Sequence, residues 1–301
     1  MITYMHEAFI AEAIEGVLMQ EVDFPVELII ADDCSPDQTS QIVKTYIETH
    51  PKGHWIKYTQ HERNKGMMPN FIWAIEQAKG KYIALCEGDD YWTDPLKLQK
   101  QVDLLEANSN SSLCVHDAWS LNDTGTLINF IYTVNKTKHT FREVINQWFP
   151  TGSIVFKKEL LNFNTRIWKE SICGDLPILA LMSGNGDFIC IPEKMSVYRL
   201  HRGGISNTIQ HKENFNLYLN RLKMYSLINS ELKNRFDNDI KDLQFEFYKR
   251  IKPTAEYNCL NSFRRMKILF LFKPYTSRFF KIFRAEWKVA LKLNRNLIQS
   301  K

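Results

Sequence analysis

The chain has 301 residues, of which 44% are hydrophobic and 24% charged, a composition typical of a globular protein that can bury a core. It contains no apolar run of 18 residues, and its first 20 residues carry acids, so we predict neither a transmembrane helix nor a signal peptide. The six cysteines lack the spacing of a metal site or of a disulfide framework, which favours reduced thiols in the cytosol.

The net charge of +5 hides an uneven distribution along the chain. Residues 249–301 hold eight Lys and six Arg against two Glu, a net charge of +12, and the rest of the chain carries −7. A basic end on an acidic body predicts an anionic partner for that end, either membrane lipid or nucleic acid.

Strand and helix patterns alternate at short intervals in the first part of the chain. Short apolar, β-favouring runs predict strands, and apolar residues spaced i, i+4 predict amphipathic helices. The predicted strands cover 1–4, 26–31, 55–60 and 82–86, and the predicted helices cover 6–20, 37–49, 68–78 and 95–107. This alternation predicts an α/β fold with a mostly parallel, doubly wound sheet.

The later part of the chain is less regular and then becomes helical. Further strands are predicted at 113–119, 128–134, 153–156, 188–192 and 195–198, and helical segments at 141–147, 158–163 and 176–182. Beyond about residue 207 the pattern is helical, broken by Pro253 and Pro274. We therefore predict one α/β domain over 1–206 and a helical, basic and aromatic extension over 207–301.

Two of the predicted strands end in neighbouring carboxylates. Asp32 and Asp33 follow the second strand, and Glu87, Asp89 and Asp90 follow the fourth. Carboxylates this close repel one another and favour a bound cation, usually a divalent metal with oxygen ligands. The carboxyl edge of an open α/β sheet is also where ligands bind. An acidic surface loop that caps a helix is the alternative for each pair alone.

Six short motifs resemble, in order and spacing, those of the family 2 glycosyltransferases, which have the GT-A fold. They are Thr3-Tyr4, Glu27 to Ser35, Asn64-Lys65-Gly66, Glu87 to Trp92, Gly174-Asp175 and Tyr198 to His201. The resemblance covers about residues 1–206. It implies an inverting transfer of a sugar from a nucleotide-activated donor, most often a UDP-sugar.

The resemblance also implies a nucleotide site. Thr3 and Tyr4 would line the base pocket, and Asp33 would accept a hydrogen bond from the base, with Asp32 beside it. Asn64 would contact the nucleotide, although a plain turn residue would also suit its position before Gly66.

The metal and the general base follow from the same resemblance. Asp89 would face the ribose or the metal, and Asp90 would hold Mg²⁺ or Mn²⁺ on the diphosphate, while Glu87 stands where many members carry Asp. Asp175 would be the general base that takes the proton of the acceptor hydroxyl. His201 would lie near the diphosphate. The alternatives are a helix N-cap for Asp175 and an ordinary loop histidine for His201.

One departure concerns the start of the chain. The family usually has five or six further strand residues and reads Thr-Tyr-Asn, whereas here Met5 takes the place of Asn. A shortened first strand should cost stability, so a non-catalytic nucleotide-sugar-binding protein is the alternative function. A nucleotidyltransferase is a weaker alternative, because residues 5–8 contain no Gly-rich phosphate loop.

The extension interleaves aromatic and basic residues over 263–288, which suits helices lying in a membrane interface. Packing of these aromatics on the first domain is the alternative. No nucleic-acid-binding module pattern is visible, so we expect no nucleic acid partner. The expected function is metal-assisted synthesis of a surface glycan on a glycan or lipid-linked acceptor. The expected location is the cytoplasm, at the inner face of the membrane.

Overall fold

The computed structural model describes all of the chain except residues 131–136, 202, 205–214, 261 and 270–301. The chain divides into two compact units, Met1–Gly204 and Ile205–Lys301. The domain boundary predicted at 206 falls outside the described residues. Among the helices that the structure describes, none is long and apolar enough to cross a membrane.

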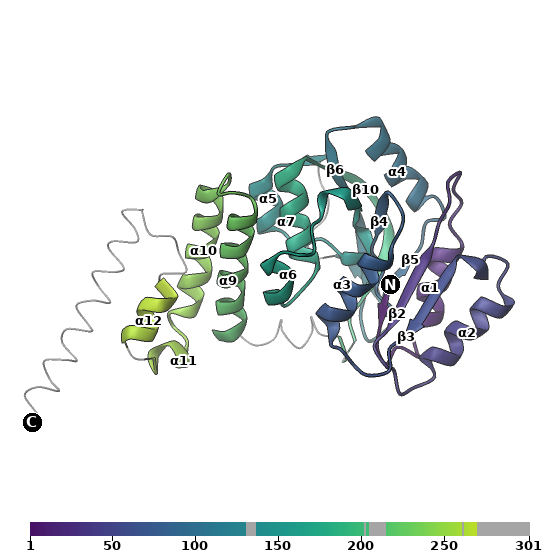
Figure 1. Cartoon of the computed structure of the whole chain (residues 1–301), viewed down its shortest axis with the longest axis horizontal. Helices are drawn as coiled ribbons and strands as arrows, with labels where there is room; N and C mark the ends of the chain where they lie inside the picture. The colour runs from purple at the N-terminus through teal and green to yellow at the C-terminus, as the bar shows by residue number, and fades with distance from the viewer. Residues whose placement is uncertain (131–136, 202, 205–214, 261, 270–301) are drawn as a thin grey trace, which may run out of the picture. The chain divides into compact units, whose positions relative to one another are not determined.

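A parallel three-stranded sheet is built from the first part of the chain (Figure 1). Its strands are β1 (Ile2–Thr3), β2 (Leu28–Asp32) and β3 (Ile56–Gln60), in that order. Helices α1 (Ile10–Leu18) and α2 (Thr39–Thr49) connect them, and α3 (Met67–Gln77) follows β3. The predicted alternation of strand and helix is confirmed here.

A second sheet has seven strands in the order β4-β9-β6-β10-β5, with β7 beside β6 and β8 beside β10. The strands are β4 (Tyr82–Ala84), β5 (Tyr91–Trp92), β6 (Ser111–Leu121), β7 (Leu127–Asn129), β8 (Lys138–His139), β9 (Val155–Lys157) and β10 (Asp187–Arg199). β6 and β10 are parallel, whereas the pairs made by the other five strands are antiparallel. The α/β class is as expected, but this second sheet is mixed.

β10 differs from the sequence expectation, which placed two separate strands at 188–192 and 195–198. It is one strand whose register on β6 shifts between Ile191 and Ser196. The polar break around Pro192 is therefore an irregularity within a strand and not its end. This continuity matters because the far end of β10 carries Arg199 into the site described below.

The edge of β1 lies between the two acidic strand ends. The backbone N–H of Asp33 donates to the carbonyl oxygen of Thr3 over 3.0 Å, and the N–H of Gly88 donates to that of Ile2 over 2.9 Å. The loops after β2 and β4 thus meet across β1, as the positions of their carboxylates predicted.

Four more helices belong to the first unit: α4 (Lys97–Ala107), α5 (Phe141–Asn146), α6 (Arg166–Glu170) and α7 (Asp175–Asn185). α5 begins with a capping box formed by Thr140 and Glu143. α7 is apolar on nearly all sides, and eight of its 11 residues are buried, as expected for a helix inside a core. Short 3₁₀ helices cover Gly53–Trp55, Thr151–Ser153 and Lys158–Leu160.

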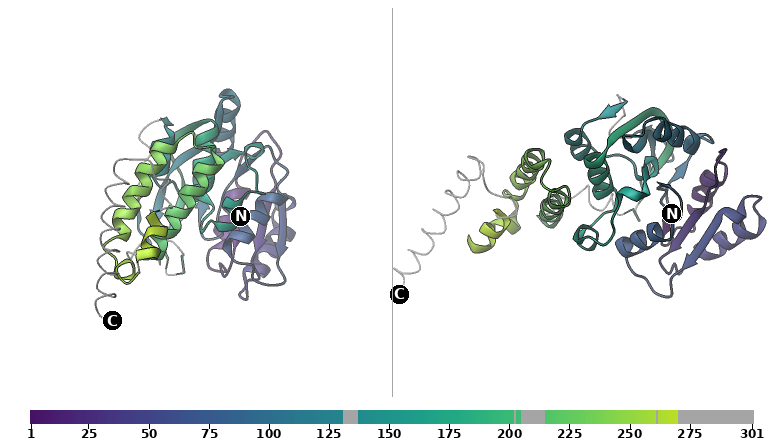
Figure 2. Two further views of the ribbon diagram at one scale, coloured as in Figure 1. Left: turned by 60° about the vertical axis from the view of Figure 1, so that its left-hand side comes forward. Right: turned by 45° about the horizontal axis from the view of Figure 1, so that its top comes forward.

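The second unit is helical. Helices α9 (Phe215–Glu231) and α10 (Asp237–Ile251) lie side by side (Figure 2), followed by α11 (Ala255–Asn258) and α12 (Ser262–Leu269). Its core includes Tyr248 and Tyr257, whose hydroxyl oxygens lie 3.0 Å apart. Most of the aromatic and basic residues over 263–288 lie outside the described residues.

Candidate active site

Asp32 is fully buried at the end of β2 and holds the loop that follows it. Its Oδ1 accepts a hydrogen bond from the backbone N–H of Ser35 over 2.8 Å, and its Oδ2 accepts one from the Tyr58 hydroxyl over 2.7 Å. Both carboxylate oxygens thus have partners inside the protein. A direct contact of Asp32 with a nucleotide stays a prediction.

Asp33 brings the Asn64–Gly66 loop to the same edge. Its two carboxylate oxygens accept the backbone N–H groups of Lys65 over 2.7 Å and Gly66 over 2.9 Å. The Oδ1 atom of Asn64 accepts the Gly66 N–H over 3.0 Å. Gly66 has φ of +88°, a conformation that favours glycine, so its place in the loop has a backbone reason. The structure therefore joins two predicted nucleotide contacts, Asp33 and Asn64.

Thr3 and Tyr4 lie where β1 ends, between the loop after β2 and the loop after β4. Thr3 is 2% exposed, and among the described residues its Oγ1 has no hydrogen-bond partner. Tyr4 is 41% exposed and is available to a ligand at the edge of the sheet. A buried hydroxyl without a partner is costly, which suits an atom that meets a ligand.

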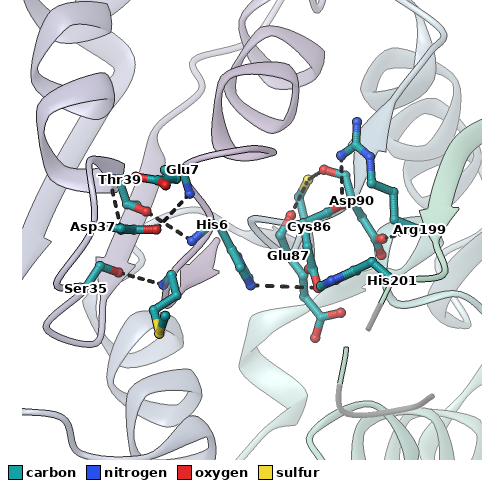
Figure 3. A network of polar contacts seen from close by, with 12 residues as sticks. His6, Glu7, Ser35, Asp37, Thr39, Cys86, Glu87, Asp90, Arg199 and His201 are labelled. Carbon is teal, nitrogen blue, oxygen red and sulfur yellow. Dashed lines mark hydrogen bonds and ion pairs between the residues drawn. The ribbon is translucent and has the colours of Figure 1, made fainter. Parts of the chain in front are cut away.

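Asp89 lies between two histidines. Its Oδ2 is 3.0 Å from Nε2 of His201 and 3.8 Å from Nε2 of His6, and Figure 3 labels these two histidines. Burial alone would raise the pKa of Asp89, but the hydrogen bond with His201 and the nearby imidazoles hold it below its usual value. The structure thus places the predicted His201 beside Asp89.

His6 is a residue of the site that the sequence reasoning missed. It follows β1, whose end lies between the loops that carry Asp33 and Asp89. Burial lowers the pKa of His6, although the charge of Asp89 acts in the opposite direction. The signal that could have found it is its position directly after the first predicted strand, where fold logic places ligand-facing residues.

Asp90 turns the other way from Asp89. It is 3% exposed, and its Oδ1 accepts the backbone N–H of Arg199 over 2.8 Å. Burial and the charges of Asp89 and Glu87 raise the pKa of Asp90 well above its usual value. Its predicted role as a metal ligand stays a prediction.

Arg199 fastens the acidic loop to the first helix, a role that the sequence did not reveal. Its guanidinium donates to the carbonyl oxygen of Asp89 over 2.8 Å and forms an ion pair with Glu12. The guanidinium carbon also lies 4.5 Å from the ring centroid of Tyr91 and 5.1 Å from that of Phe9. A planar cation held by a fork of hydrogen bonds and by two rings is a rigid support.

Asp175 begins α7, and Gly174 takes the N-cap position. The alternative interpretation of Asp175 as an N-cap is therefore wrong by one residue. A Cβ atom on Gly174 would meet the Phe71 ring at 2.4 Å, so a larger residue there would require that ring to move. Burial and the charges of Asp89 and Asp175 raise the pKa of Glu87 to about 8, so Asp175 belongs to the same electrostatic cluster.

The metal-binding side chains of the site suit a divalent metal that is held partly by the protein and partly by the phosphates of a bound substrate. Across the described part of the chain, no three His, Cys, Asp or Glu side chains are grouped as a metal site. Mg²⁺ usually binds through one or two carboxylates together with substrate phosphates and water, and neutral imidazole is a common metal ligand in proteins. Asp89 and His201, 3.0 Å apart, fit this requirement. The crowding that raises the pKa of Glu87 is what a cation would relieve.

Solved structures share this fold. TarS 1–349 of S. aureus in complex with UDP-GlcNAc has a TM-score of 0.65 at 19% identity, covering 90% of this chain and 77% of that one. The mannosyltransferase PcManGT from Pyrobaculum calidifontis, in complex with GDP-Man and Mn²⁺, has a TM-score of 0.52 at 14% identity, covering 100% and 86%. Together with the topology above, these similarities define a protein of the GT-A class, as the sequence predicted.

The family follows from the sequence. The model of the family described as Glycosyl transferase family 2 matches residues 1–160, and the chain belongs to this family. An uncharacterized protein of Mycobacterium tuberculosis (strain ATCC 25618 / H37Rv) is 32% identical over 210 residues. That match covers 68% of this chain and 58% of the relative. The putative glycosyltransferase EpsE of Bacillus subtilis (strain 168) is 38% identical over 103 residues, 34% of this chain and 36% of EpsE.

Proposed function

We propose that this chain is an inverting glycosyltransferase. It moves a sugar from a nucleoside-diphosphate donor, a UDP-sugar, to a hydroxyl of a glycan or lipid-linked acceptor in surface polysaccharide synthesis. The observation that carries the proposal is Asp89 beside His201, in a loop that meets the Asp33 loop across β1. The named relatives support the process, since TuaG of Bacillus subtilis is a putative teichuronic acid biosynthesis glycosyltransferase, 32% identical over 107 residues.

The nucleoside end of the donor would bind at the edge of β1. Asp33 would accept a hydrogen bond from the base, and the unpartnered Thr3 hydroxyl and the exposed Tyr4 ring would line the pocket. Asn64 would complete this side, because Asp33 fastens its loop in place. Asp32 would act indirectly, by holding in place the loop that carries Asp33.

The diphosphate would lie at Asp89. Bound Mg²⁺ or Mn²⁺ would supply positive charge that stabilises the leaving nucleoside diphosphate. Asp89 and His201 would hold it, with Asp90 as the further ligand that the family resemblance implies. Arg199 keeps the loop in place by its bond to the Asp89 carbonyl oxygen.

Asp175 would accept the proton of the acceptor hydroxyl as the sugar is transferred. Asp175 stands in the first turn of α7, where Gly174 lies close to the Phe71 ring. General base catalysis of this kind contributes about 10²–10⁴-fold to a rate. Glu87, whose pKa is raised to about 8, can carry a proton at neutral pH and so reduces the repulsion among the carboxylates.

The test starts with a thermal-shift screen of nucleotide sugars with and without Mn²⁺, because a ligand that binds only the folded state raises the melting temperature. The stabilising donor is then used in a transfer assay with the wild type and with Asp175→Asn. We expect the variant to bind the donor like the wild type and to lose about 10²–10⁴-fold in transfer rate. Binding without turnover, unchanged in Asp175→Asn, would instead support a nucleotide-sugar-binding protein.

We also propose peripheral contact of the basic extension with anionic lipid at the cytoplasmic face of the membrane. Basic and aromatic side chains pair in the described part of this unit. Lys249 lies 5.3 Å from the ring centroid of Phe245, and Arg250 lies 5.7 Å from that of Phe247. Such pairs suit an interface. Flotation with anionic liposomes tests this, and no flotation, or flotation unchanged in an Arg264→Glu/Arg265→Glu double variant, would favour packing on the first unit.

A further inference from the structure

The turn that carries His6 is built by side chains from another loop. Three consecutive backbone N–H groups each donate to a side chain of the segment after β2. The bonds are Met5 N–H to Ser35 Oγ (3.0 Å), His6 N–H to Thr39 Oγ1 (3.1 Å) and Glu7 N–H to Asp37 Oδ2 (3.1 Å). The Glu7 carboxylate in turn accepts the Gln38 N–H over 2.8 Å. Figure 3 shows Ser35, Asp37 and Thr39 facing the turn that carries His6 and Glu7.

The same turn contains a strained backbone. Met5 has φ of +57°, in the left-handed region that residues other than glycine seldom adopt. Strain of this kind persists only where the surroundings determine the conformation, and it concentrates at functional sites. Here the surroundings are the three side-chain caps, and the result is a fixed direction for the next residue, His6.

His6 is directed at Asp89. Its Nε2 lies 3.8 Å from Asp89 Oδ2, the same oxygen that lies 3.0 Å from Nε2 of His201. The Nδ1 side of the imidazole lies close to Gly88, because a Cβ atom added to Gly88 would be 2.8 Å from Nδ1. The His6 and His201 rings meet edge to face with centroids 6.5 Å apart. Two imidazoles from opposite ends of the first unit's sequence thus flank one carboxylate oxygen.

We propose that His6 is a positioning residue for Asp89. It holds the Asp89 carboxylate, together with His201, in the orientation that binds the metal and diphosphate of the donor. Because Thr39 caps the His6 N–H, this orientation also depends on Thr39, which lies in the segment after β2. The proposal rests on the proposed function, since it assumes a donor diphosphate at Asp89.

The electrostatics explain why one carboxylate would need two supports. Glu87 and Asp90 lie within two positions of Asp89, and the crowding of buried carboxylates raises the pKa of both neighbours. The imidazoles of His201 and His6, 3.0 and 3.8 Å from Oδ2 of Asp89, restrain rotation of its carboxylate before the ligand arrives. Groups that orient a metal-binding side chain typically contribute about 10–100-fold to metal affinity.

The experiment measures binding and needs no turnover. Isothermal titration of the full-length chain gives the affinity for Mn²⁺ in the presence of UDP, for the wild type and four variants. His6→Phe keeps a ring on Phe9 and Gly88 but removes the nitrogen, and His6→Gln restores an N–H donor. Thr39→Val removes the cap on the His6 N–H together with the contact of the Thr39 hydroxyl with Asp37, and Ser40→Ala, one position along α2, is the control.

We expect His6→Phe to weaken Mn²⁺ binding about tenfold, and His6→Gln and Ser40→Ala to stay within about threefold of the wild type. Thr39→Val should fall between them. In an Asp89→Asn background, His6→Phe should cause no further loss, because its effect runs through Asp89. Melting temperatures of all variants show that each is folded.

Two results would overturn the inference alone: His6→Phe binding Mn²⁺ like the wild type, or its loss persisting in full in the Asp89→Asn background. A wild type that binds UDP with no dependence on Mn²⁺ would overturn the inference and the metal part of the proposed function together. A wild type that binds neither UDP nor Mn²⁺ would overturn the proposed function itself.

Discussion

The backbone N–H of Arg199 donates a hydrogen bond to Oδ1 of Asp90 over 2.8 Å, joining residues that lie 109 positions apart in the chain. Through this bond the end of β10 holds the acidic loop after β4. Of the two adjacent aspartates, one therefore faces β10 and the other faces the histidines. The first prediction follows from this division.

Asp90→Asn keeps an acceptor oxygen for the Arg199 N–H and removes a buried charge. We expect its free energy of unfolding to stay within about 1 kcal/mol of the wild type, whereas Asp90→Ala should lose about 1–3 kcal/mol because it leaves that N–H unpaired. Urea denaturation measures both. Equal losses in the two variants would mean that the hydrogen bond is not what Asp90 contributes.

The same aspartates differ in the metal binding that we predict. Because Asp89 faces His201 and Asp90 faces Arg199, Asp89→Asn should weaken Mn²⁺ binding in the presence of UDP more than Asp90→Asn does. We expect a difference of at least about tenfold. Isothermal titration measures this difference. Equal losses of Mn²⁺ affinity in the two variants would mean that Asp90 contributes to metal binding as much as Asp89 does.

Met5 occupies a position that the family resemblance gives to Asn, and its φ of +57° supplies a physical reason for that choice. Asparagine adopts the left-handed conformation more readily than methionine, and Met5, at 54% exposed, loses little burial when replaced. We expect Met5→Asn to raise the free energy of unfolding by about 0.5–1 kcal/mol. Met5→Val, which is β-branched, should lower it, and a stabilised valine variant would contradict the argument.

Lys97 should make stability depend on pH. It is fully buried in α4, its Nζ donates to Gln101 Oε1 over 2.8 Å, and burial lowers its pKa to about 7 from the ordinary value of 10.5. Between these pKa values the unfolded chain binds the extra proton, so this residue makes stability rise as pH increases from about 7.

Lys97→Met removes that proton and keeps the length of the side chain. We expect the free energy of unfolding of the wild type, relative to Lys97→Met, to increase by up to about 1.4 kcal/mol per pH unit between pH 7 and 8.5. Taking the difference between the two proteins removes the contribution of Glu87, whose raised pKa acts in the opposite direction. A difference that stays constant with pH would show that Lys97 titrates normally in the folded state.

Arg199→Lys should lower the free energy of unfolding although the positive charge is kept. Lysine cannot reach the Asp89 carbonyl oxygen and Glu12 as a planar fork, and it loses the stacking on Tyr91. We expect a loss of about 2 kcal/mol in the free energy of unfolding. Glu12→Gln, which keeps an acceptor on the 61%-exposed partner side chain, should cost less than half of that. A larger loss of stability in Glu12→Gln than in Arg199→Lys would mean that Arg199 stabilises the loop through its ion pair with Glu12 alone.

Much of the fold and part of the site followed from local sequence patterns. The alternation of strands and helices in the first part of the chain, the acidic ends of β2 and β4, and the glycine of the Asn64–Gly66 loop are each encoded within a few neighbouring residues. Periodicity and turn chemistry report such features directly. The mixed pairing of the second sheet is not local, because β6 and β10 join segments about 75 residues apart, as the bond from Ser112 to Asp187 illustrates.

By itself, the sequence determined that carboxylates would gather at the carboxyl ends of two strands, since strand direction and the order of elements place them there. Only the tertiary structure decided what each carboxylate does. Asp89 differs from its neighbour Asp90 because His201 and Arg199, 112 and 109 positions further on, arrive on different sides of the loop. His6 joined the site only when a strained turn, capped from another loop, directed it there. Hydrogen bonds between distant segments carry that information, and no local pattern contains it.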